Sequence, residues 1–334
     1  MLASFLESYF KDKDLKRIFK DVTDTDNADV IQPIINQAIE QYLQSSIERI
    51  IFIQSSIGVV FGLLLTTGSK VVLKVYSPKL SKSYLQEINR ILVILQQENF
   101  PSPKVLSPIF AFNKTYAGCY ELIEGKVEDA HQPMIREELA KYLAKFSILA
   151  EKHDFQPVEN FFQQAAYGKL WPIPHNALFN IKASSKGAGW IAKKAALAKK
   201  TLAAYGGKKT LSHTDWGTKN AVFRNKQLIG IFDWDSLGSM TELEMVGRAA
   251  AQFTADWESG FKITPSPEEG RLFVNAYQNY RNIKFTEDEY KIISASADYL
   301  ITIIARFEHA GKNPLASPYQ DLSKACGQSS FLFA

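Results

Sequence analysis

Hydrophobic and polar residues alternate with two different periods in the first quarter of this chain. In residues 1–48 apolar residues recur every three or four positions, as in DVIQPIINQAIEQYL, which is typical of amphipathic helices. We expect two helices there, joined by a turn at TDTDN. In residues 49–76 the apolar residues form short, mostly β-branched runs, which predict three strands at 49–54, 59–65 and 70–76.

Further along the chain the helical period returns. It predicts one helix over 81–98, followed by two strands at 105–112 and 117–123. From residue 133 onward the pattern is mainly helical, apart from the segment 211–237. We therefore expect an α+β fold, with a β-rich first half that contains one embedded helix and a helical second half.

Residues 50–69 carry no charge and are long enough to imitate a membrane span. Polar residues and a Thr-Thr-Gly turn interrupt the segment, and its apolar residues are largely β-branched. Two buried strands joined by a tight loop explain this pattern better than a membrane helix does. We expect no membrane partner.

Composition narrows the class of protein. With 46% hydrophobic and 22% charged residues, the chain is typical of a soluble globular protein with a sizeable core. The net charge of +4 is not concentrated in a basic stripe, which argues against nucleic-acid binding. The only two cysteines, Cys119 and Cys326, are far apart, which excludes a disulfide scaffold and suits a cytoplasmic protein.

The segment LSHTDWGTKNAVFRNKQLIGIFDWDSL, residues 211–237, is unusually rich in chemically useful side chains. Two apolar runs on either side of the polar turn RNK predict a β-hairpin. Such a hairpin would bring Asp215 and Asn220 to face Asp233. Oxygen ligands from two loops are what Mg²⁺ requires, because this ion shares its remaining coordination positions with phosphates and water.

The spacing His213-x-Asp215-x₄-Asn220 matches the catalytic-loop pattern of kinases. In that pattern the aspartate orients or deprotonates the substrate hydroxyl, and the asparagine binds metal. The acid after the next strand, here Asp233, supplies the second metal ligand. We therefore predict that Asp215 is catalytic, that Asn220 and Asp233 hold Mg²⁺, and that His213 stabilises the loop by hydrogen bonding.

The stretch SHTDWGTKNAVF…IGIFDWDS resembles the aminoglycoside phosphotransferase and choline kinase superfamily, which carries His-Gly-Asp-x-His-x-x-Asn followed by Ile-Asp-Trp-Glu/Asp. This resemblance implies a protein-kinase-like two-lobed fold. It implies a helical N-terminal extension at 1–48, a nucleotide-binding N-lobe at 49–122 and a helical C-lobe with the catalytic loop at 123–334. It also implies an ATP- and Mg²⁺-dependent phosphotransferase that acts on a hydroxyl of a small molecule.

The resemblance predicts a phosphate-anchoring lysine on the third strand. Lys74 in KVVLKVY occupies that place, in an apolar run where an unpaired ammonium would be costly. The family partner of this lysine is a glutamate on the next helix, which corresponds to Glu87 in SYLQEINRILVIL. Glu98 is a weaker alternative.

The rest of the nucleotide site follows from the same resemblance. The loop QSSIG, with Ser55 and Ser56, would cover the nucleotide phosphates, although it lacks a glycine-rich pattern. The segment CYELIEG matches the family's hinge between lobes. Backbone groups of Glu121 and Ile123 would meet the adenine edge there.

Several positions depart from the family pattern. Gly217 stands where the family has its second histidine, and Lys219 stands where a small residue precedes the asparagine. Ser147 replaces a histidine that is frequent in relatives, and Met245 or Val246 lies near the family's Asp-Leu-Ala aspartate. These departures indicate a divergent member.

The acceptor is open between an aminoglycoside, choline or another amino alcohol, and a sugar. A group of acidic residues in the second half would suit a cationic acceptor, but most of them also match helix caps. These residues are Asp256, Glu258, Glu268, Glu269, Glu287, Asp288 and Glu289. Trp171, Phe253 and Trp257 are candidates for cation–π contacts with an amine, or for core packing.

Two other functions compete with this hypothesis. One is a non-catalytic nucleotide-binding protein on the same fold, but an intact set of Lys74, Asp215, Asn220 and Asp233 argues against it. The other is a metal-dependent phosphohydrolase that uses His213 and Asp215 as ligands. It would require further histidines at ligand spacing, and the remaining histidines are scattered singly.

Overall fold

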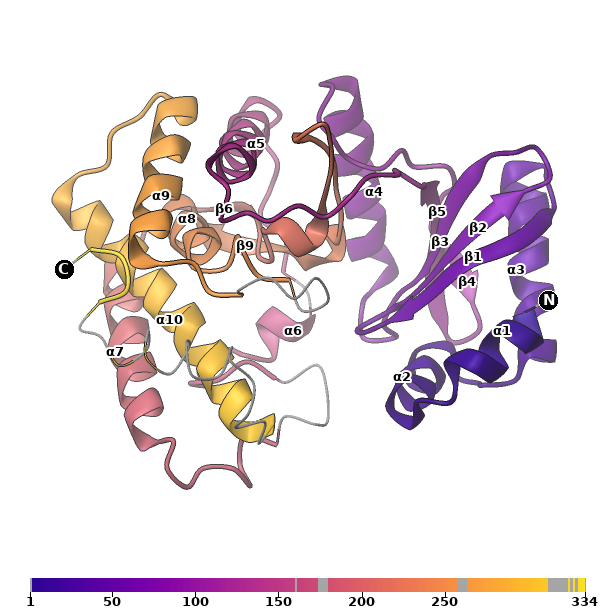
Figure 1. Ribbon diagram of the computed structural model, residues 1–334, viewed down its shortest axis with the longest axis horizontal. Coiled ribbons are helices and arrows are strands. Elements are labelled where there is room, and N and C mark those ends of the chain that lie inside the picture. Colours follow the sequence, from indigo (N-terminus) through magenta and orange to yellow (C-terminus); the bar gives the residue numbers. More distant parts are fainter. Residues whose placement is uncertain are drawn as a thin grey trace. The chain divides into compact units, whose positions relative to one another are not determined.

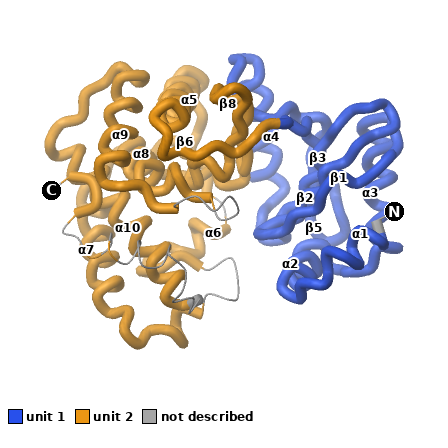
Figure 2. Tube along the Cα trace, in the orientation of Figure 1, with its two compact units in different colours: residues 1–124 blue, residues 125–334 orange. Residues whose placement is uncertain are grey.

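A computed structural model describes residues 2–159, 161–173, 180–256, 263–311, 324, 327 and 330–333. The chain divides into two compact units, residues 1–124 and residues 125–334 (Figure 2). The assignment of roles to 1–48, 49–122 and 123–334 stays a prediction. Trp257, Glu258 and Cys326, named above as candidates, lie outside the described residues. Among the described helices, none is long and apolar enough to cross a membrane.

The first unit combines helices with one antiparallel sheet (Figure 1). Its elements are α1 (Leu2–Tyr9), α2 (Lys13–Thr23), α3 (Ala28–Leu43), β1 (Ile47–Ser55), β2 (Val59–Leu65), β3 (Lys70–Val75), α4 (Lys82–Gln97), β4 (Phe110–Phe112) and β5 (Thr115–Glu121). The strand order is β1-β2-β3-β5-β4. The predicted α+β fold with a β-rich first half and an embedded helix is confirmed.

Side-chain alternation divides the sheet into two faces. The odd-numbered residues of β2 and β3 are buried in one hydrophobic cluster with residues of α1, α2 and α3. Lys74 is even-numbered and therefore points to the opposite face, where it is paired with Val60 on β2 and Gly118 on β5. The N-terminal helices thus cover the sheet face opposite to the one on which Lys74 lies.

Helix α4 packs on the same face as Lys74. Ser81 caps this helix by accepting a hydrogen bond from the Tyr84 amide. Tyr120 projects from β5 on this face and donates to Asn89 Oδ1 of α4 at 2.7 Å, and its hydroxyl lies 2.6 Å from that of Tyr76. This chain of polar contacts fixes α4 against the sheet.

Two local predictions in the first unit are wrong. The region 1–48 contains three helices and not two, because Asp12 caps a separate helix α2 by accepting from the amides of Asp14 and Leu15. The strand predicted at 105–112 is reduced to β4, with an isolated bridge between Val105 and Tyr120. The prolines within 101–108 lack the N–H groups that a longer ladder requires.

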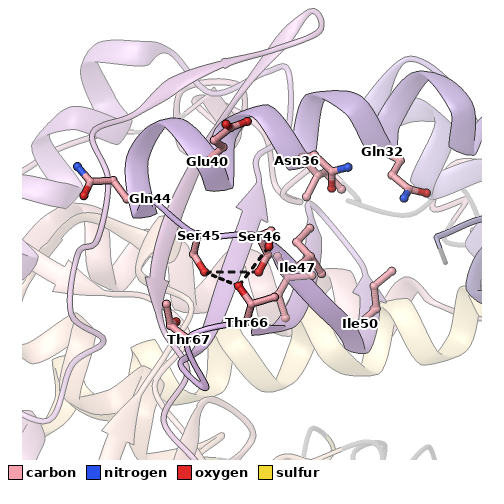
Figure 3. A pocket seen from close by; sticks show the side chains of 12 residues that line it. Gln32, Asn36, Glu40, Gln44, Ser45, Ser46, Ile47, Ile50, Thr66 and Thr67 are labelled. Atoms are coloured by element: carbon pink, nitrogen blue, oxygen red, sulfur yellow. Dashed lines mark hydrogen bonds between the residues drawn. The ribbon is translucent and has the colours of Figure 1, made fainter.

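A cavity of about 650 Å³ lies in the first unit, between α3 and the β1–β2 strands (Figure 3). Polar side chains line much of it, among them Glu40 of α3, Gln44 directly after α3 and Thr66 directly after β2. The Ser46 and Thr66 hydroxyls lie 3.1 Å apart at its wall. None of the site residues predicted from the sequence lines this cavity.

The second unit is mainly helical (Figure 1). Its elements are α5 (Pro133–Lys152), α6 (Phe161–Gln164), α7 (Gly189–Tyr205), β6 (Lys209–His213), η1 (Thr218–Asn220), β7 (Ala221–Arg224), β8 (Gln227–Ile231), η2 (Trp234–Ser236), β9 (Leu237–Thr241), α8 (Glu242–Ala250), α9 (Pro267–Arg281) and α10 (Glu287–Gly311). This confirms the predicted helical second half.

Two short strand pairs interrupt the helices of this unit. The predicted hairpin is present: β7 pairs with β8, with Ala221 opposite Ile231. Its turn residues Asn225 and Lys226 both have positive φ angles, 51° and 61°, as a tight two-residue hairpin turn requires. The pairing of β6 with β9, which places His213 opposite Leu237, was not predicted.

Candidate active site

The loop between β6 and the η1 turn holds Asp215 with both carboxylate oxygens engaged. Lys219 Nζ lies 2.8 Å from Oδ1, and Asn220 Nδ2 donates to Oδ2 at 3.1 Å. The same Nδ2 donates to the Asp215 carbonyl oxygen at 2.7 Å. The carboxamide of Asn220 is thereby oriented with its nitrogen toward Asp215, so its Oδ1 atom is left to serve as a ligand.

Electrostatics keep Asp215 ionised. Burial by itself raises the pKa of this carboxyl, but the charge and hydrogen bond of Lys219 outweigh burial, and Arg248 adds a smaller effect in the same direction. The net result lowers the pKa of Asp215 to about 2. Asp215 is therefore a carboxylate at neutral pH and a weak base.

His213 connects the loop to the segment that follows β8. Its Nε2 lies 3.0 Å from the Phe232 carbonyl oxygen, and Ser236 Oγ lies 3.2 Å from its Nδ1. Burial lowers the pKa of His213, which favours the neutral ring, and the carbonyl contact places the ring hydrogen on Nε2. The rings of Trp216 and Trp234 pack edge-on against it. These contacts agree with the predicted role in stabilising the loop.

The hairpin brings Asp233 next to the η1 turn. The Phe232 amide donates to the Asn220 carbonyl oxygen at 2.8 Å, so Asp233 follows directly after a residue bonded to Asn220. Asp233 has a left-handed backbone, with φ 60° and ψ 43°, and its carbonyl oxygen accepts from the Ser236 amide at 2.9 Å. Among the described residues no three His, Cys, Asp or Glu side chains are grouped to hold a metal. A cation here would rely on the Asn220 carboxamide and the Asp233 carboxylate together with ligands from the substrate.

The loop packs closely on the end of α8, and this explains one departure from the family pattern. The Thr218 amide donates to the Phe253 carbonyl oxygen at 2.9 Å. A Cβ atom at Gly217 would lie 2.9 Å from the Gln252 carbonyl oxygen and 3.3 Å from Phe253 Cα. The backbone at Gly217 is extended, with φ 172°, so space and not conformation restricts this position. The family's second histidine has no room here.

In the first unit, Lys74 lies on the sheet face on which α4 packs. Lys74 is half-buried, and its Nζ lies 5.5 Å from the centre of the Tyr76 ring. Val60 and Val72 on the same face are also half-buried, and the ring of Tyr120 lies over Gly118 beside Lys74. Partly exposed apolar side chains thus lie next to an ammonium group.

The predicted ion pair between Lys74 and Glu87 is not formed, which corrects that prediction. Both carboxylate oxygens of Glu87 are bound by Arg90, with Nε at 2.9 Å and the terminal nitrogen at 2.6 Å. Arg90 is one turn along the same helix, so the pair forms without any tertiary adjustment. Glu87 therefore faces its own helix surface in this structure.

The predicted phosphate loop is the β1–β2 connection. Ser55 Oγ lies 2.7 Å from the Tyr9 hydroxyl of α1, and the Ser56 amide donates to the Gly58 carbonyl oxygen at 3.0 Å. Tyr9 was not recognised from the sequence as a neighbour of this loop. Its hydroxyl holds Ser55, so the N-terminal helix contacts a segment that was predicted to bind phosphates.

The predicted hinge residues follow β5. The amides of Glu121 and Leu122 donate to the carbonyl oxygens of Lys104 and Lys70, at 2.9 and 3.2 Å. The Ile123 amide has no hydrogen bond in the part of the chain that the structure describes. The backbone at Ile123 is therefore available to a ligand, whereas the Glu121 amide is not.

Two of the acidic residues proposed for a cationic acceptor serve as helix caps. Glu269 forms a capping box with Ser266 at the start of α9. Glu289 accepts from the Thr286 amide at the start of α10 at 2.7 Å. Phe253, one of the aromatic candidates, is fully buried and stacks on Phe273. Glu269, Glu289 and Phe253 therefore stabilise the fold through these contacts.

Two cationic neighbours of Asp215 complete the site. Lys219 had been noted only as a departure from the family pattern, although its position four residues after Asp215 allows the contact now seen. Arg248 of α8 donates from Nε to the carbonyl oxygen of Thr214. Nothing in the sequence marked Arg248, because its contact depends on the packing of α8 against the loop.

Comparison with known proteins identifies one matching family. Residues 60–285 match the model of the phosphotransferase enzyme family. No curated protein sequence is significantly similar to the chain.

Solved structures with a similar fold include several small-molecule kinases. An amicoumacin kinase in complex with AMP-PNP, Ca²⁺ and Ami is 11% identical, with 91% of this chain and 95% of that chain covered and a TM-score of 0.62. The GDP complex of aminoglycoside 2'-phosphotransferase-IIIa is 12% identical, with 89% and 97% covered and a TM-score of 0.55. The ethanolamine kinase of Plasmodium vivax is 14% identical, with 95% and 92% covered and a TM-score of 0.54. At these identities the likeness concerns the fold.

Proposed function

The chain belongs to the phosphotransferase enzyme family, and on that premise we propose that it transfers the γ-phosphoryl group of ATP to a hydroxyl of a small molecule, with Mg²⁺ as cofactor. Complexes of similar structures with AMP-PNP or GDP support a nucleotide as the phosphoryl donor. The choice of ATP and of Mg²⁺ rests on the catalytic-loop spacing and on the hard oxygen donors of the site.

The observation that carries this proposal is the arrangement around Asp215. The carboxylate is held between Lys219 and Asn220, in a loop that the neighbouring hairpin links to Asp233. Phosphoryl transfer requires little proton abstraction until late in the reaction, so a weak base that orients the hydroxyl is sufficient. A pKa of about 2 therefore favours Asp215 as the group that orients the acceptor.

The transfer itself uses simple chemistry. The acceptor hydroxyl oxygen, hydrogen-bonded to Asp215, attacks the γ-phosphorus while the bond from phosphorus to the β–γ bridging oxygen breaks. The hydroxyl proton passes to Asp215 as the new P–O bond forms and is then released to solvent, and ADP leaves. Lys219 is close enough to Asp215 to share the charge that develops in this step.

Asn220 and Asp233 are suited to hold Mg²⁺. Asn220 directs its nitrogen to Asp215 and so presents an oxygen, and Asp233 adds a carboxylate after the hairpin. Carboxamide and carboxylate oxygens are the donor types that Mg²⁺ takes from proteins. When bound, Mg²⁺ would neutralise charge on the β- and γ-phosphates.

For the first unit we propose separate contacts to the nucleotide. Lys74 would bind the phosphates, and the partly exposed Val60 and Val72 on the same face would contact the base. The free amide of Ile123 would serve the adenine edge, with the carbonyl of Glu121, and the loop of Ser55 and Ser56 would lie over the phosphates. Glu87 has no role in this scheme, because Arg90 binds both of its carboxylate oxygens.

The experiment that tests this function is thermal unfolding with ATP, with and without Mg²⁺, for the wild type and Asp233→Asn. Ligand at about 100 times its dissociation constant adds about 2.7 kcal/mol of stability, enough for a shift of several degrees. We expect a Mg²⁺-dependent shift in the wild type that Asp233→Asn loses. Asp288→Asn is the matched control, because it removes an exposed carboxylate from α10.

The outcomes separate the two remaining functions. A Mg²⁺-dependent shift that is followed by ADP release in the presence of an acceptor supports the kinase. Nucleotide binding without release of ADP to any acceptor or to water would favour a non-catalytic nucleotide-binding protein. No shift with any nucleotide would contradict both.

A further inference from the structure

The guanidinium of Arg248 is poorly satisfied for a charged group beside a catalytic loop. Its Nε donates to the Thr214 carbonyl oxygen, which also accepts from Gln252 Nε2 at 3.2 Å. In the part of the chain that the structure describes, this is the sole side-chain hydrogen bond of Arg248, and Arg248 has no ion pair there. Both terminal nitrogens therefore lack a protein acceptor there.

Burial of this guanidinium disfavours its charge, although solvent still reaches the terminal nitrogens. Arg248 is half-buried, and burial lowers its pKa, which shows that the surroundings solvate the charge poorly. The guanidinium keeps its charge at neutral pH in any protein. An anion that met its two terminal nitrogens would remove this cost, because the planar fork of arginine matches carboxylate and phosphate oxygens in pairs.

Among the residues that the structure describes, no neighbouring group fills this place. Asp215 acts on Arg248 through space, but its oxygens are already bound to Lys219 and Asn220. Tyr299 of α10 also lies near enough to interact, but burial raises its pKa to about 12, so the phenol is neutral, and its hydroxyl donates to the Leu170 carbonyl oxygen. Asp215, Lys219 and Arg248 together carry one net positive charge, and the carboxylate of Asp233 next to the loop is the one proposed to be taken up by Mg²⁺.

We infer that Arg248 binds an anionic group of the acceptor, so that the substrate class is a small hydroxyl compound bearing a carboxylate or a phosphate. This inference rests on the proposed function, because it assumes that Asp215 meets an acceptor hydroxyl. It replaces the polycation that the acidic residues had suggested. Two of those residues, Glu269 and Glu289, cap helices, whereas two groups close to Asp215, Lys219 and Arg248, are cationic and disfavour a polyamine.

The transferring phosphoryl group of ATP is a second source of the same chemistry, and the experiment separates the two. Thermal unfolding is measured with glycerate, malonate or inorganic phosphate as the anion, and with glycerol as the uncharged match for glycerate. Each is added with and without Mg²⁺ and a saturating non-hydrolysable ATP analogue, so that the phosphates of the nucleotide are already in place. The proteins are the wild type, Arg248→Gln and Arg17→Gln, which removes an exposed arginine paired with Asp14.

We expect at least one anion to raise the melting temperature of the wild type and of Arg17→Gln by several degrees in the presence of the analogue, while glycerol does not. Arg248→Gln should lose this shift and still be stabilised by the analogue. In turnover, Arg248→Gln should lower kcat/KM for an anionic acceptor by roughly 30-fold or more, mainly through KM. A neutral acceptor should be almost unaffected.

Three results would overturn the inference. One is an anion shift that disappears when the analogue is bound, because Arg248 would then serve the nucleotide. Another is an equal loss of rate with neutral and anionic acceptors and of ATP hydrolysis in Arg248→Gln. The third is the absence of any anion shift in the wild type. Failure of the proposed function would look different: the analogue and Mg²⁺ would not stabilise the wild type at all.

Discussion

The predicted site residues of the two units differ in how they are held. In the second unit, Asp215, Asn220 and the segment before Asp233 are joined by direct hydrogen bonds within the segment 211–237. In the first unit, residues that were not predicted bind the predicted ones: Arg90 of the same helix binds Glu87, and Tyr9 of α1 binds Ser55. The second unit contributes a self-contained loop and hairpin, whereas the predicted residues of the first unit lie on separate strands and helices.

This difference shows which contacts a sequence pattern can specify. A hairpin with a two-residue turn fixes the distance between the residues at its ends, so spacing alone predicts that Asn220 meets the start of the Asp233 segment. A contact between a strand and a helix must compete with partners on the same helix. Glu87 pairs with Arg90, which lies three positions later on the same helix.

The largest effect is expected from removing the charge of Asp215. Asp215→Asn keeps the size of the side chain but removes the group that orients the acceptor, so kcat should fall by roughly 10³-fold. ADP release with the best acceptor measures this. The circular-dichroism spectrum and the binding of ATP should be retained. A variant with more than a tenth of the wild-type rate would show that Asp215 is not the catalytic residue.

The second-largest effect is expected from the ion pair between Asp215 and Lys219, and its contribution to stability depends on pH. The lowered pKa of Asp215 stabilises the folded protein above the pKa of an unfolded aspartate, about 3.9, and this contribution is lost as the pH falls through about 2. In Lys219→Met the folded pKa rises, so the variant should be less stable at pH 7 by about 1–3 kcal/mol.

Urea unfolding of the wild type and Lys219→Met from pH 7 down to pH 2 tests this prediction. The two free energies of unfolding should begin to converge as the pH falls below about 4 and become equal only near pH 2, where Asp215 of the folded wild type also takes up a proton. The acidic limb of kcat/KM should move to higher pH in the variant. A constant difference in stability at every pH would show that Lys219 acts by packing and not by charge.

Close packing of the loop predicts a loss of stability at Gly217. Gly217→Ala places a Cβ atom against two main-chain atoms, which cannot move as a side chain would. The free energy of unfolding should fall by about 1–3 kcal/mol. Gly189→Ala is the matched control, because nothing lies within 4 Å of its Cβ position at the start of α7. Equal stabilities of the two variants would contradict the steric account.

The smallest effect is expected in the first unit, at Glu87. Glu87→Gln breaks an exposed pair with Arg90, so the stability should change by only a few tenths of a kcal/mol and the KM for ATP should change less than about twofold. Lys74→Met should raise the KM for ATP much more, by roughly tenfold or more. If both variants raised it equally, Glu87 would have to reach Lys74 during turnover.

The fold was predictable where one pattern of hydrophobic residues, helical or strand-like, dominates a segment. Strands β2 and β3 are short apolar runs bounded by turn residues, and their limits were therefore found almost to the residue. The N-terminal helices were merged into two, since the cap at Asp12 lies inside an apparently continuous helical pattern. The β6–β9 pair was missed because it depends on contacts between distant segments.

The site was predictable to the same degree and for the same reason. The positions of Asp215, Asn220 and Asp233 followed from loop and hairpin geometry, although their roles in catalysis stay predictions. Arg248 and Tyr9 were not recognised, because each reaches its neighbour only through the packing of a whole helix. Physical contact between elements, and not local propensity, decides those positions.

The helices that precede the family match have a consequence for how this chain can be cut or recombined. The similarity spans 60–285, yet Leu6, Phe19 and Ile31 are buried in the same cluster as the strands of the sheet. At the other end, Phe331 and Leu332 are also buried. A fragment trimmed to the region of similarity would expose apolar surface at both ends and aggregate. Chimaeras between relatives would fold only if each exchanged module carried the terminal segments that complete its own core.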